Sequence, residues 1–187
     1  MTVNVETTTD TEQLRLIEGL KKKDETVLKE VMQMYKNRVF KYLHLMLRNK
    51  EKAEDITQET FVTVYFKAGS IRTANLKAWI FRIATNHAIS ELRKEKIKRF
   101  FSLDDPETEQ PAVKPNVGQD LELEQMLALI PEKSRIPVIM KQIDNFSFEE
   151  IAEIMDKPIS TIKTLVYRGL EQLRINLSPL QSGGIHE

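Results

Sequence analysis

Residues 146–174, FSFEEIAEIMDKPISTIKTLVYRGLEQLR, limit the possible folds most, because they predict two short helices joined by a tight turn. Ser147 is placed to cap the first helix, and Glu150 three residues later completes a capping box. The first helix ends just before Pro158, since a residue that precedes proline is disfavoured in helical conformation. Ser160 is then expected to cap the second helix. Two caps around a turn of this kind are typical of a helix-turn-helix.

The second helix has one apolar face and one polar face. Its apolar positions recur at helical spacing: Ile162, Leu165, Val166, Gly169 and Leu173. The polar face carries hydroxyl and cationic side chains that suit base edges and phosphates: Ser160, Thr161, Lys163, Thr164, Tyr167 and Arg168. A solvated helical hairpin would share part of this pattern. The two caps, the small Ala152 and the placement of the cations favour DNA binding.

Composition indicates an all-α protein with no cofactor. The 187 residues are enough for one or two domains, glycine occurs only six times, and charged residues make up 30%. The absence of cysteine removes disulfides, thiolate metal sites and thiol catalysis, and fits a reducing cytoplasm. Apolar runs are too short to span a membrane, and residues 1–10 lack a secretory signal pattern. We therefore expect a cytoplasmic protein without membrane insertion.

The N-terminal half predicts a tail and short helix over residues 1–23, followed by a helical domain over residues 24–100. Three apolar residues mark the short helix: Leu14, Ile17 and Leu20. Asp24 is a good N-cap for a long helix. Apolar side chains recur along that helix every three or four positions: Leu28, Val31, Tyr35, Val39, Tyr42 or Leu43, and Met46. This stripe predicts the core of a helical bundle.

Asn49 is placed to cap the next helix, which has an apolar side and an acidic side. The apolar side holds Ala53, Ile56, Thr60, Phe61, Val64 and Tyr65. The opposite side of the first two turns holds Glu54, Asp55, Gln58 and Glu59. Alone, this cluster would be a solvated face with favourable charges near a helix N-terminus. A di-iron carboxylate site is disfavoured, because the chain has three histidines and no Glu-x-x-His pair, so we expect no metal.

A loop over residues 67–75 leads into a helix that begins near Leu76. Its apolar side holds Trp79, Ile80, Ile83, Ala84, Ala88 and Leu92. The other side presents cationic and hydrogen-bonding groups: Arg82, Asn86, Ser90, Arg93 and Lys94. Residues 80–99 contain six Lys or Arg against Glu91 and Glu95. Such a stripe suits a phosphate backbone, and asparagine can read a base edge, although a basic helix end also complements its own dipole.

Residues 101–119 differ in composition and predict a flexible acidic linker between two small helical domains. They contain three prolines, and four acids oppose a single lysine. The second domain then covers residues 120–178 and ends in the helix-turn-helix, with a polar tail over residues 179–187. Pro137 falls in the first turn of a helix if Ser134 is the cap, and bends the helix if it begins earlier.

In this order, these segments resemble a bacterial sigma factor of the extracytoplasmic-function (ECF) group, within the sigma-70 family of RNA polymerase subunits. The resemblance covers roughly residues 24–177. It is carried by AEDITQETF at residues 53–61, WIFRIATNHAISELRKEK at residues 79–96, Leu129-Ile130-Pro131 and the helix-turn-helix. A helix-turn-helix alone occurs in many regulators. The acidic patch followed by the tryptophan and the basic helix is specific.

The resemblance implies a non-enzymatic subunit that directs the polymerase core to promoters and promotes opening of the DNA strands. Its expected partners are core polymerase, promoter DNA and an anti-sigma factor, with no small-molecule substrate. Matching positions imply core binding by Asp55, Gln58 and Glu59, and reading of the −10 element by Arg82, Asn86, Ser90, Arg93 and Lys94. They imply reading of the −35 element by Ser160, Thr161, Lys163, Thr164, Tyr167 and Arg168.

Two other classes of function fit part of the sequence. A stand-alone dimeric helix-turn-helix regulator would bind a palindrome without polymerase, but it would leave Asp55, Gln58 and Glu59 without a role. An enzyme built on a carboxylate bundle would need a metal, which the missing histidine pairs disfavour. The sigma-factor interpretation gives a role to the acidic patch, to the basic helix and to the helix-turn-helix.

Overall fold

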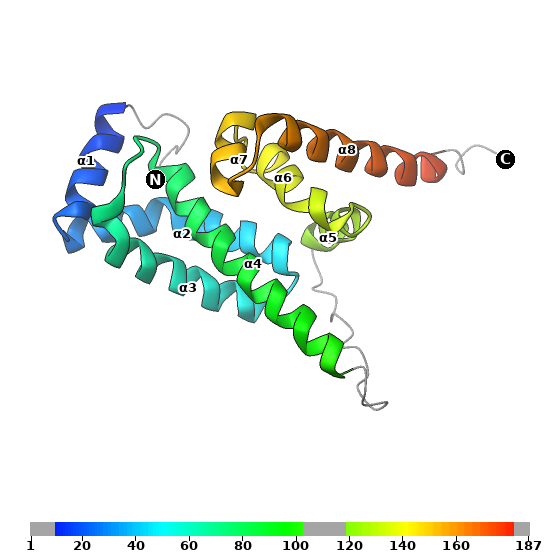
Figure 1. Cartoon of the computed structure of the whole chain (residues 1–187), viewed down its shortest axis with the longest axis horizontal. Coiled ribbons are helices and arrows are strands. Elements are labelled where there is room, and N and C mark those ends of the chain that lie inside the picture. Colours follow the sequence, from blue (N-terminus) through cyan, green and yellow to red (C-terminus); the bar gives the residue numbers. More distant parts are fainter. Residues whose placement is uncertain (1–9, 103–118, 182–187) are drawn as a thin grey trace. The chain divides into compact units, whose positions relative to one another are not determined.

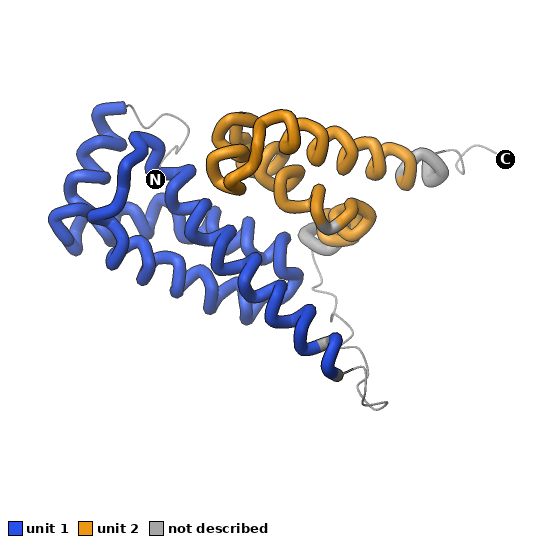
Figure 2. Tube along the Cα trace, in the orientation of Figure 1, with its two compact units in different colours: residues 1–110 blue, residues 111–187 orange. Residues whose placement is uncertain are grey.

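The computed structural model describes residues 10–102 and 119–181, which form eight α-helices and one short 3₁₀ helix (Figure 1). No β-strand occurs in these two ranges, so the all-α prediction is confirmed. The chain divides into two compact units, residues 1–110 and 111–187 (Figure 2). Most of the predicted acidic linker, residues 103–118, lies outside the described residues.

The first unit contains four α-helices and the 3₁₀ helix: α1 (Asp10–Lys21), α2 (Glu25–Leu47), α3 (Lys50–Lys67), η2 (Ala68–Ser70) and α4 (Leu76–Ser102). Both predicted caps are confirmed. The side chain of Asp24 accepts hydrogen bonds from the backbone N–H of Thr26 and Val27, and that of Asn49 accepts one from Lys52 at 2.9 Å. These bonds satisfy donors that the first turns of α2 and α3 would otherwise leave unpaired.

Helices α2, α3 and α4 pack against one another and form the core of this unit. Side chains of α2 at the predicted spacing are buried, including Val31, Tyr35 and Val39. Between α2 and α4, the Tyr42 hydroxyl lies 2.9 Å from Oγ1 of Thr85, so a buried tyrosine finds a polar partner inside the core. This bundle fixes the outer faces of α3 and α4, which carry the candidate site.

The predicted short helix is α1, and two of the three apolar residues that mark it, Ile17 and Leu20, are buried. Leu14 is half exposed, and Leu16, which the apolar pattern did not single out, is buried. The reason is tertiary: α1 packs on α2 and η2 so closely that a Cβ on Gly19 would lie 2.6 Å from Cγ2 of Val27. The face that meets Val27 therefore decides which leucine is covered.

The second unit contains α5 (Gln119–Ala128), α6 (Glu132–Gln142), α7 (Phe148–Met155) and α8 (Ile159–Gln181). The predicted capping box of α7 is confirmed: Glu150 N–H donates to Ser147 Oγ at 3.1 Å, and Ser147 N–H donates to Glu150 Oε2 at 2.7 Å. Asp156 follows α7 with φ 51° and ψ 53°, the left-handed conformation that ends a helix. Helices α7 and α8 thus form the predicted helix-turn-helix.

One local prediction in this unit is wrong, and one alternative that the sequence left open is decided. Ser160 does not cap α8, because the helix begins at Ile159 and the Ile162 N–H donates to the Pro158 carbonyl at 3.1 Å. Of the two starts left open for α6, the structure has the earlier one: the helix begins at Glu132 and holds Pro137 in its interior. Pro131 directly precedes α6 and Pro158 directly precedes α8, where a missing backbone N–H breaks no hydrogen bond within the helix. Helix α8 also continues past residue 178.

Helix α8 crosses α6 at close range, and this contact orients its outer face. A Cβ on Gly169 would lie 2.7 Å from Cγ2 of Val138, so glycine is needed at the crossing. Ile162 and Val166 of α8 are buried in the same core. The opposite face of α8 is left in solvent.

Candidate functional site

The outer face of α3 carries the three residues predicted to bind polymerase, which we call the docking patch: Asp55, Gln58 and Glu59. All three are exposed, while Ile56 and Thr60 on the other side of the helix are buried. Spacings of three and four residues place Asp55, Gln58 and Glu59 on neighbouring turns of one face. The patch therefore offers two carboxylates and an amide on a helix fixed by the core.

The outer face of α4 carries five residues that we call the α4 stripe: Arg82, Asn86, Ser90, Arg93 and Lys94. All five are exposed, whereas Phe81, Ala84 and Thr85 on the other side are completely buried. The structure therefore brings the predicted −10 residues onto one solvent-facing surface. Three of them are cationic and two are neutral hydrogen-bonding groups.

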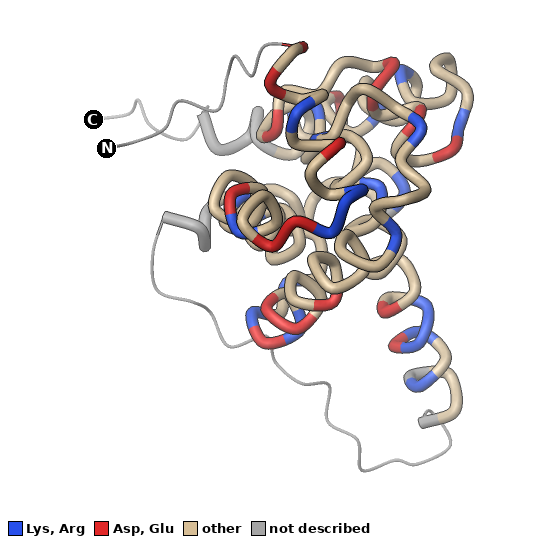
Figure 3. Tube along the Cα trace, turned by 90° about the vertical axis from the view of Figure 1, so that its left-hand side faces the viewer, with Lys and Arg blue, Asp and Glu red and all other residues tan. Residues whose placement is uncertain are grey.

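The acids of α4 are paired across the bundle by Lys52 of α3. Its Nζ lies 3.0 Å from Oε1 of Glu91 and also forms an ion pair with Glu95 (charges are coloured in Figure 3). The hydrogen bond from Lys52 is the main cause that lowers the pKa of Glu91. Burial alone would lower the pKa of Lys52, but its two carboxylate partners raise it overall. Glu91 also pairs with Lys94 of the α4 stripe at 3.6 Å, so Lys52 and Lys94 together balance the two carboxylates.

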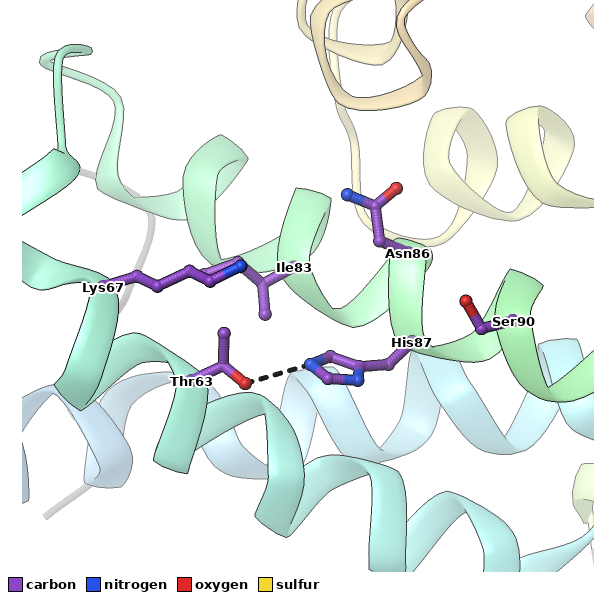
Figure 4. Close-up of a pocket in the computed structure, with 6 residues that line it drawn as sticks. All are labelled: Thr63, Lys67, Ile83, Asn86, His87 and Ser90. Carbon is purple, nitrogen blue, oxygen red and sulfur yellow. Dashed lines mark hydrogen bonds between the residues drawn. The ribbon is translucent and has the colours of Figure 1, made fainter.

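A pocket of roughly 200 Å³ lies between α3 and α4, lined by Thr63, Lys67, Ile83, Asn86, His87 and Ser90 (Figure 4). Two members of the α4 stripe, Asn86 and Ser90, line this pocket, while Arg82, Arg93 and Lys94 do not. Five of the six lining side chains carry a hydrogen-bonding group, and none is a carboxylate. The pocket is therefore suited to a polar or anionic group.

His87 joins the pocket to the docking patch. Its Nε2 lies 3.0 Å from Oγ1 of Thr63, the bond drawn in Figure 4, and its Nδ1 lies 3.4 Å from Oε2 of Glu59. In the tautomer that can hydrogen-bond to both neighbours, Nδ1 carries the proton and donates to Glu59, and Nε2 accepts a hydrogen bond from the Thr63 hydroxyl. One imidazole thus contacts two residues on successive turns of α3.

Sequence reasoning missed Thr63, Lys67 and His87 as members of this site. A signal was present, because Glu59, Thr63 and Lys67 are four residues apart and share one face of α3. That spacing does not reveal which helix covers the face. Only the packing of α3 against α4 brings His87 to it.

The loop before α4 is fixed at both ends. Ile71 is buried, and the side chain of Asn75 accepts a hydrogen bond from the Ala78 N–H at 2.9 Å, which caps α4. The Leu76 N–H donates to Oε1 of Gln13 on α1 at 3.2 Å. The loop is therefore tied to the bundle, while Arg72 remains exposed.

In the second unit, the six residues predicted to read the −35 element are all exposed on the first turns of α8: Ser160, Thr161, Lys163, Thr164, Tyr167 and Arg168. The Tyr167 ring lies 6.0 Å from that of Phe148, centroid to centroid, and Lys163 Nζ lies 5.7 Å from the Phe148 centroid. These contacts with α7 orient two of the exposed side chains. The face offers hydroxyl and cationic groups at the start of a helix.

Other kinds of site find no support in the described ranges. Residues 10–102 and 119–181 hold no cluster of three side chains able to bind a metal ion. Within the same ranges, no helix is long and apolar enough to cross a membrane.

Comparison with known proteins gives matches in both units. The family model for Sigma-70 region 2 matches residues 31–97, and the model for Sigma-70 region 4 matches residues 120–173. Among curated proteins, the chain is 32% identical over 179 residues to the ECF RNA polymerase sigma factor SigW of Bacillus subtilis, covering 88% of this chain and 96% of SigW. It is 28% identical over 152 residues to the ECF factor SigE of Mycolicibacterium smegmatis, a match that covers 78% of this chain and 59% of SigE.

A solved structure supports the same relationship. The sigma factor RpoE of Bartonella quintana, crystallised with the anti-sigma factor NepR, superposes with a TM-score of 0.68 at 27% identity. The match covers 80% of this chain and 95% of RpoE. The α4 stripe lies within the region 2 match, and the exposed face of α8 lies within the region 4 match.

Proposed function

The chain belongs to the ECF group of RNA polymerase sigma factors, and from this premise we propose which of its surfaces perform each step of promoter recognition. Its function is to direct core polymerase to promoters, and the family matches support this function over that of a stand-alone dimeric regulator. We propose that it acts by binding alone, without catalysing a reaction. It works where the polymerase works, in the cytoplasm.

The docking patch binds the polymerase core. Asp55 and Glu59 are exposed carboxylates on a helix whose other face is buried, so a partner can reach them without unfolding the bundle. Carboxylates attract basic side chains, and charge-assisted hydrogen bonds are stronger than neutral ones. Gln58 adds a neutral donor and acceptor between them.

The α4 stripe holds the unpaired strand of the −10 element. Arg82, Arg93 and Lys94 neutralise phosphates. Each neutralised phosphate of a single strand adds ~0.7 to the steepness with which log affinity falls against log salt concentration. Asn86 reads a base edge, because its amide presents both a donor and an acceptor. Opening a base-pair step costs about 1.4 kcal/mol, which contacts on the captured strand offset.

The first turns of α8 read the −35 element in the major groove. Thr161 and Thr164 are short enough to reach base edges, and Lys163 and Arg168 reach phosphates or guanine. The close α6–α8 crossing at Gly169 holds the helix with this face outward. The Ser160 hydroxyl lies in the first turn of α8 and contacts the −35 element from there.

An anti-sigma factor is a further expected partner. The related RpoE was crystallised with one, NepR. A protein that covers the docking patch and the exposed face of α8 would block polymerase and promoter together. This partner would regulate the chain by occlusion.

The exposure of all three surfaces on folded helices is the observation that carries this proposal. It is tested by transcribing a fragment library of the source genome with core polymerase, with and without the chain, and mapping the 5′ ends. The chain should add start sites that share one −35 and one −10 motif. The same start sites with core alone would contradict the proposal.

A further inference from the structure

The pocket between α3 and α4 has the chemistry of a phosphate site. Lys67 supplies a positive charge, and Asn86 and Ser90 supply groups able to donate hydrogen bonds. In Figure 4 the Lys67 side chain extends from α3 towards Ile83 of α4. These side chains come from two packed helices of one bundle, so the backbone on both sides of the pocket is fixed.

A carboxylate stands beside this pocket. Glu59 does not line it, but its Oε2 lies 3.4 Å from Nδ1 of His87, which does. A negative charge next to a phosphate site weakens anion binding, because like charges repel over several ångströms. Removing or pairing that charge strengthens the same site.

Glu59 also belongs to the docking patch and is accessible, with 64% of its side chain exposed. A cationic group of the polymerase that pairs with Glu59 would therefore cancel the charge that opposes the phosphate. His87 is shared between the two sites, since it contacts Glu59 through one nitrogen and Thr63 through the other.

We propose that this pocket binds a backbone phosphate of the unpaired −10 strand, and that Glu59 keeps the pocket weak until polymerase pairs with its carboxylate. His87 is the positioning residue that couples the two surfaces. This inference rests on the proposed roles of the docking patch and the α4 stripe. By linkage, the bound strand strengthens polymerase docking by the same factor.

The test measures fluorescence anisotropy of the full chain without polymerase, using a labelled single strand that carries the non-template −10 sequence of a mapped promoter. Glu59→Gln should tighten binding about five-fold, at the lower end of typical coupling between sites. Glu54→Gln is the matched control, because it removes an equal charge five residues earlier on α3, from a side chain that pairs with Lys50 at 4.0 Å. It should change the affinity less than two-fold.

Two further variants identify the route. His87→Gln keeps a polar group near Thr63 and loses the contact with Glu59, so adding Glu59→Gln to it should give less than a two-fold gain. Lys67→Met should weaken binding and lower the salt slope by ~0.7, the value for one phosphate of a single strand. The same sequence as a duplex should show none of these effects.

Equal affinities of the Glu59→Gln variant and the unaltered chain would overturn the inference. A gain of the same size from Glu54→Gln would also overturn it, because net charge alone would then explain the effect. Asn86→Ala distinguishes a failure of this inference from a failure of the proposed −10 role of the α4 stripe. If it leaves strand binding unchanged, the proposed −10 role of the α4 stripe is wrong, and the inference fails with it.

Discussion

The Lys52 ammonium group on α3 lies 3.0 Å from the Glu91 carboxylate on α4. The two helices carry the docking patch and the α4 stripe, so this ion pair fixes one candidate surface relative to the other. Because Lys52 also pairs with Glu95, its single positive charge offsets part of the negative charge that these two acids place on a helix proposed to bind DNA. The Lys52–Glu91 ion pair therefore contributes both to the stability of the helical bundle and to the charge of the α4 surface.

Lys52→Met should lower the free energy of unfolding of the first unit by about 1 kcal/mol, the upper end for a partly exposed ion pair. Denaturant unfolding at low and high salt measures this, and the loss should shrink with salt. Lys50→Met is the matched control, because its 4.0 Å pair with Glu54 is more exposed. Equal effects of the two substitutions would contradict a special role for Lys52.

The same pair predicts a pH dependence. Lys52 lowers the pKa of Glu91 below its ordinary value of 4.5, so the folded state binds this proton less readily than the unfolded state. The stabilisation is complete above pH 4.5 and is lost as the pH falls through the lower, folded-state pKa. Unfolding measured between pH 6 and pH 3 should show a smaller loss for Glu91→Gln than for the unaltered chain. Identical profiles would refute the assignment.

Reversing two charges of the docking patch, Asp55→Arg with Glu59→Arg, should abolish co-purification with core polymerase. Both side chains are exposed, so the fold should be retained, as circular dichroism would show. The control reverses two other exposed acids of the first unit, Glu18 and Glu51. Normal polymerase binding by the first variant would remove the docking patch from the account.

Asn86→Ala should reduce strand opening about tenfold, because a lost base-edge contact costs ~1–3 kcal/mol. Permanganate reactivity of unpaired thymines at the promoter measures the opening. Binding of the polymerase complex to a −35 duplex should not change. If opening is normal and −35 binding is lost, the assignment of the two units is reversed.

Lys163→Ala and Arg168→Ala should weaken binding to promoters through the −35 element alone. If Arg168 contacts a phosphate, its substitution should also lower the slope of log affinity against log salt by ~1. The measurement compares promoters with intact and scrambled −35 elements. Equal losses on both would place these side chains outside −35 recognition.

Local chemistry made much of this structure predictable. The caps at Asp24, Asn49 and Ser147 depend on residues two or three positions away, so the sequence identified them correctly. Exposure of the docking patch and the α4 stripe followed from helical spacing. These features need only the chain near each residue.

Features that depend on packing were not predictable. Leu14 has helical spacing with Ile17 and Leu20, yet it is half exposed, because the packing of α1 on α2 decides how far the buried face extends. Ser160 is a suitable cap by residue type, yet the helix begins at Ile159, directly after Pro158 and two residues earlier than a Ser160 cap would allow. The pocket needs Lys67 and His87 from two helices, and no short-range pattern in the sequence pairs them.

The most direct test of the account measures thymine reactivity around the −10 element of a mapped promoter, with core polymerase and the chain added separately and together. The account predicts opening only when both are present, and loss of opening with either Asn86→Ala or the Asp55→Arg, Glu59→Arg double variant. Specific promoter binding by the chain alone, with no further opening when core polymerase is added, would contradict it.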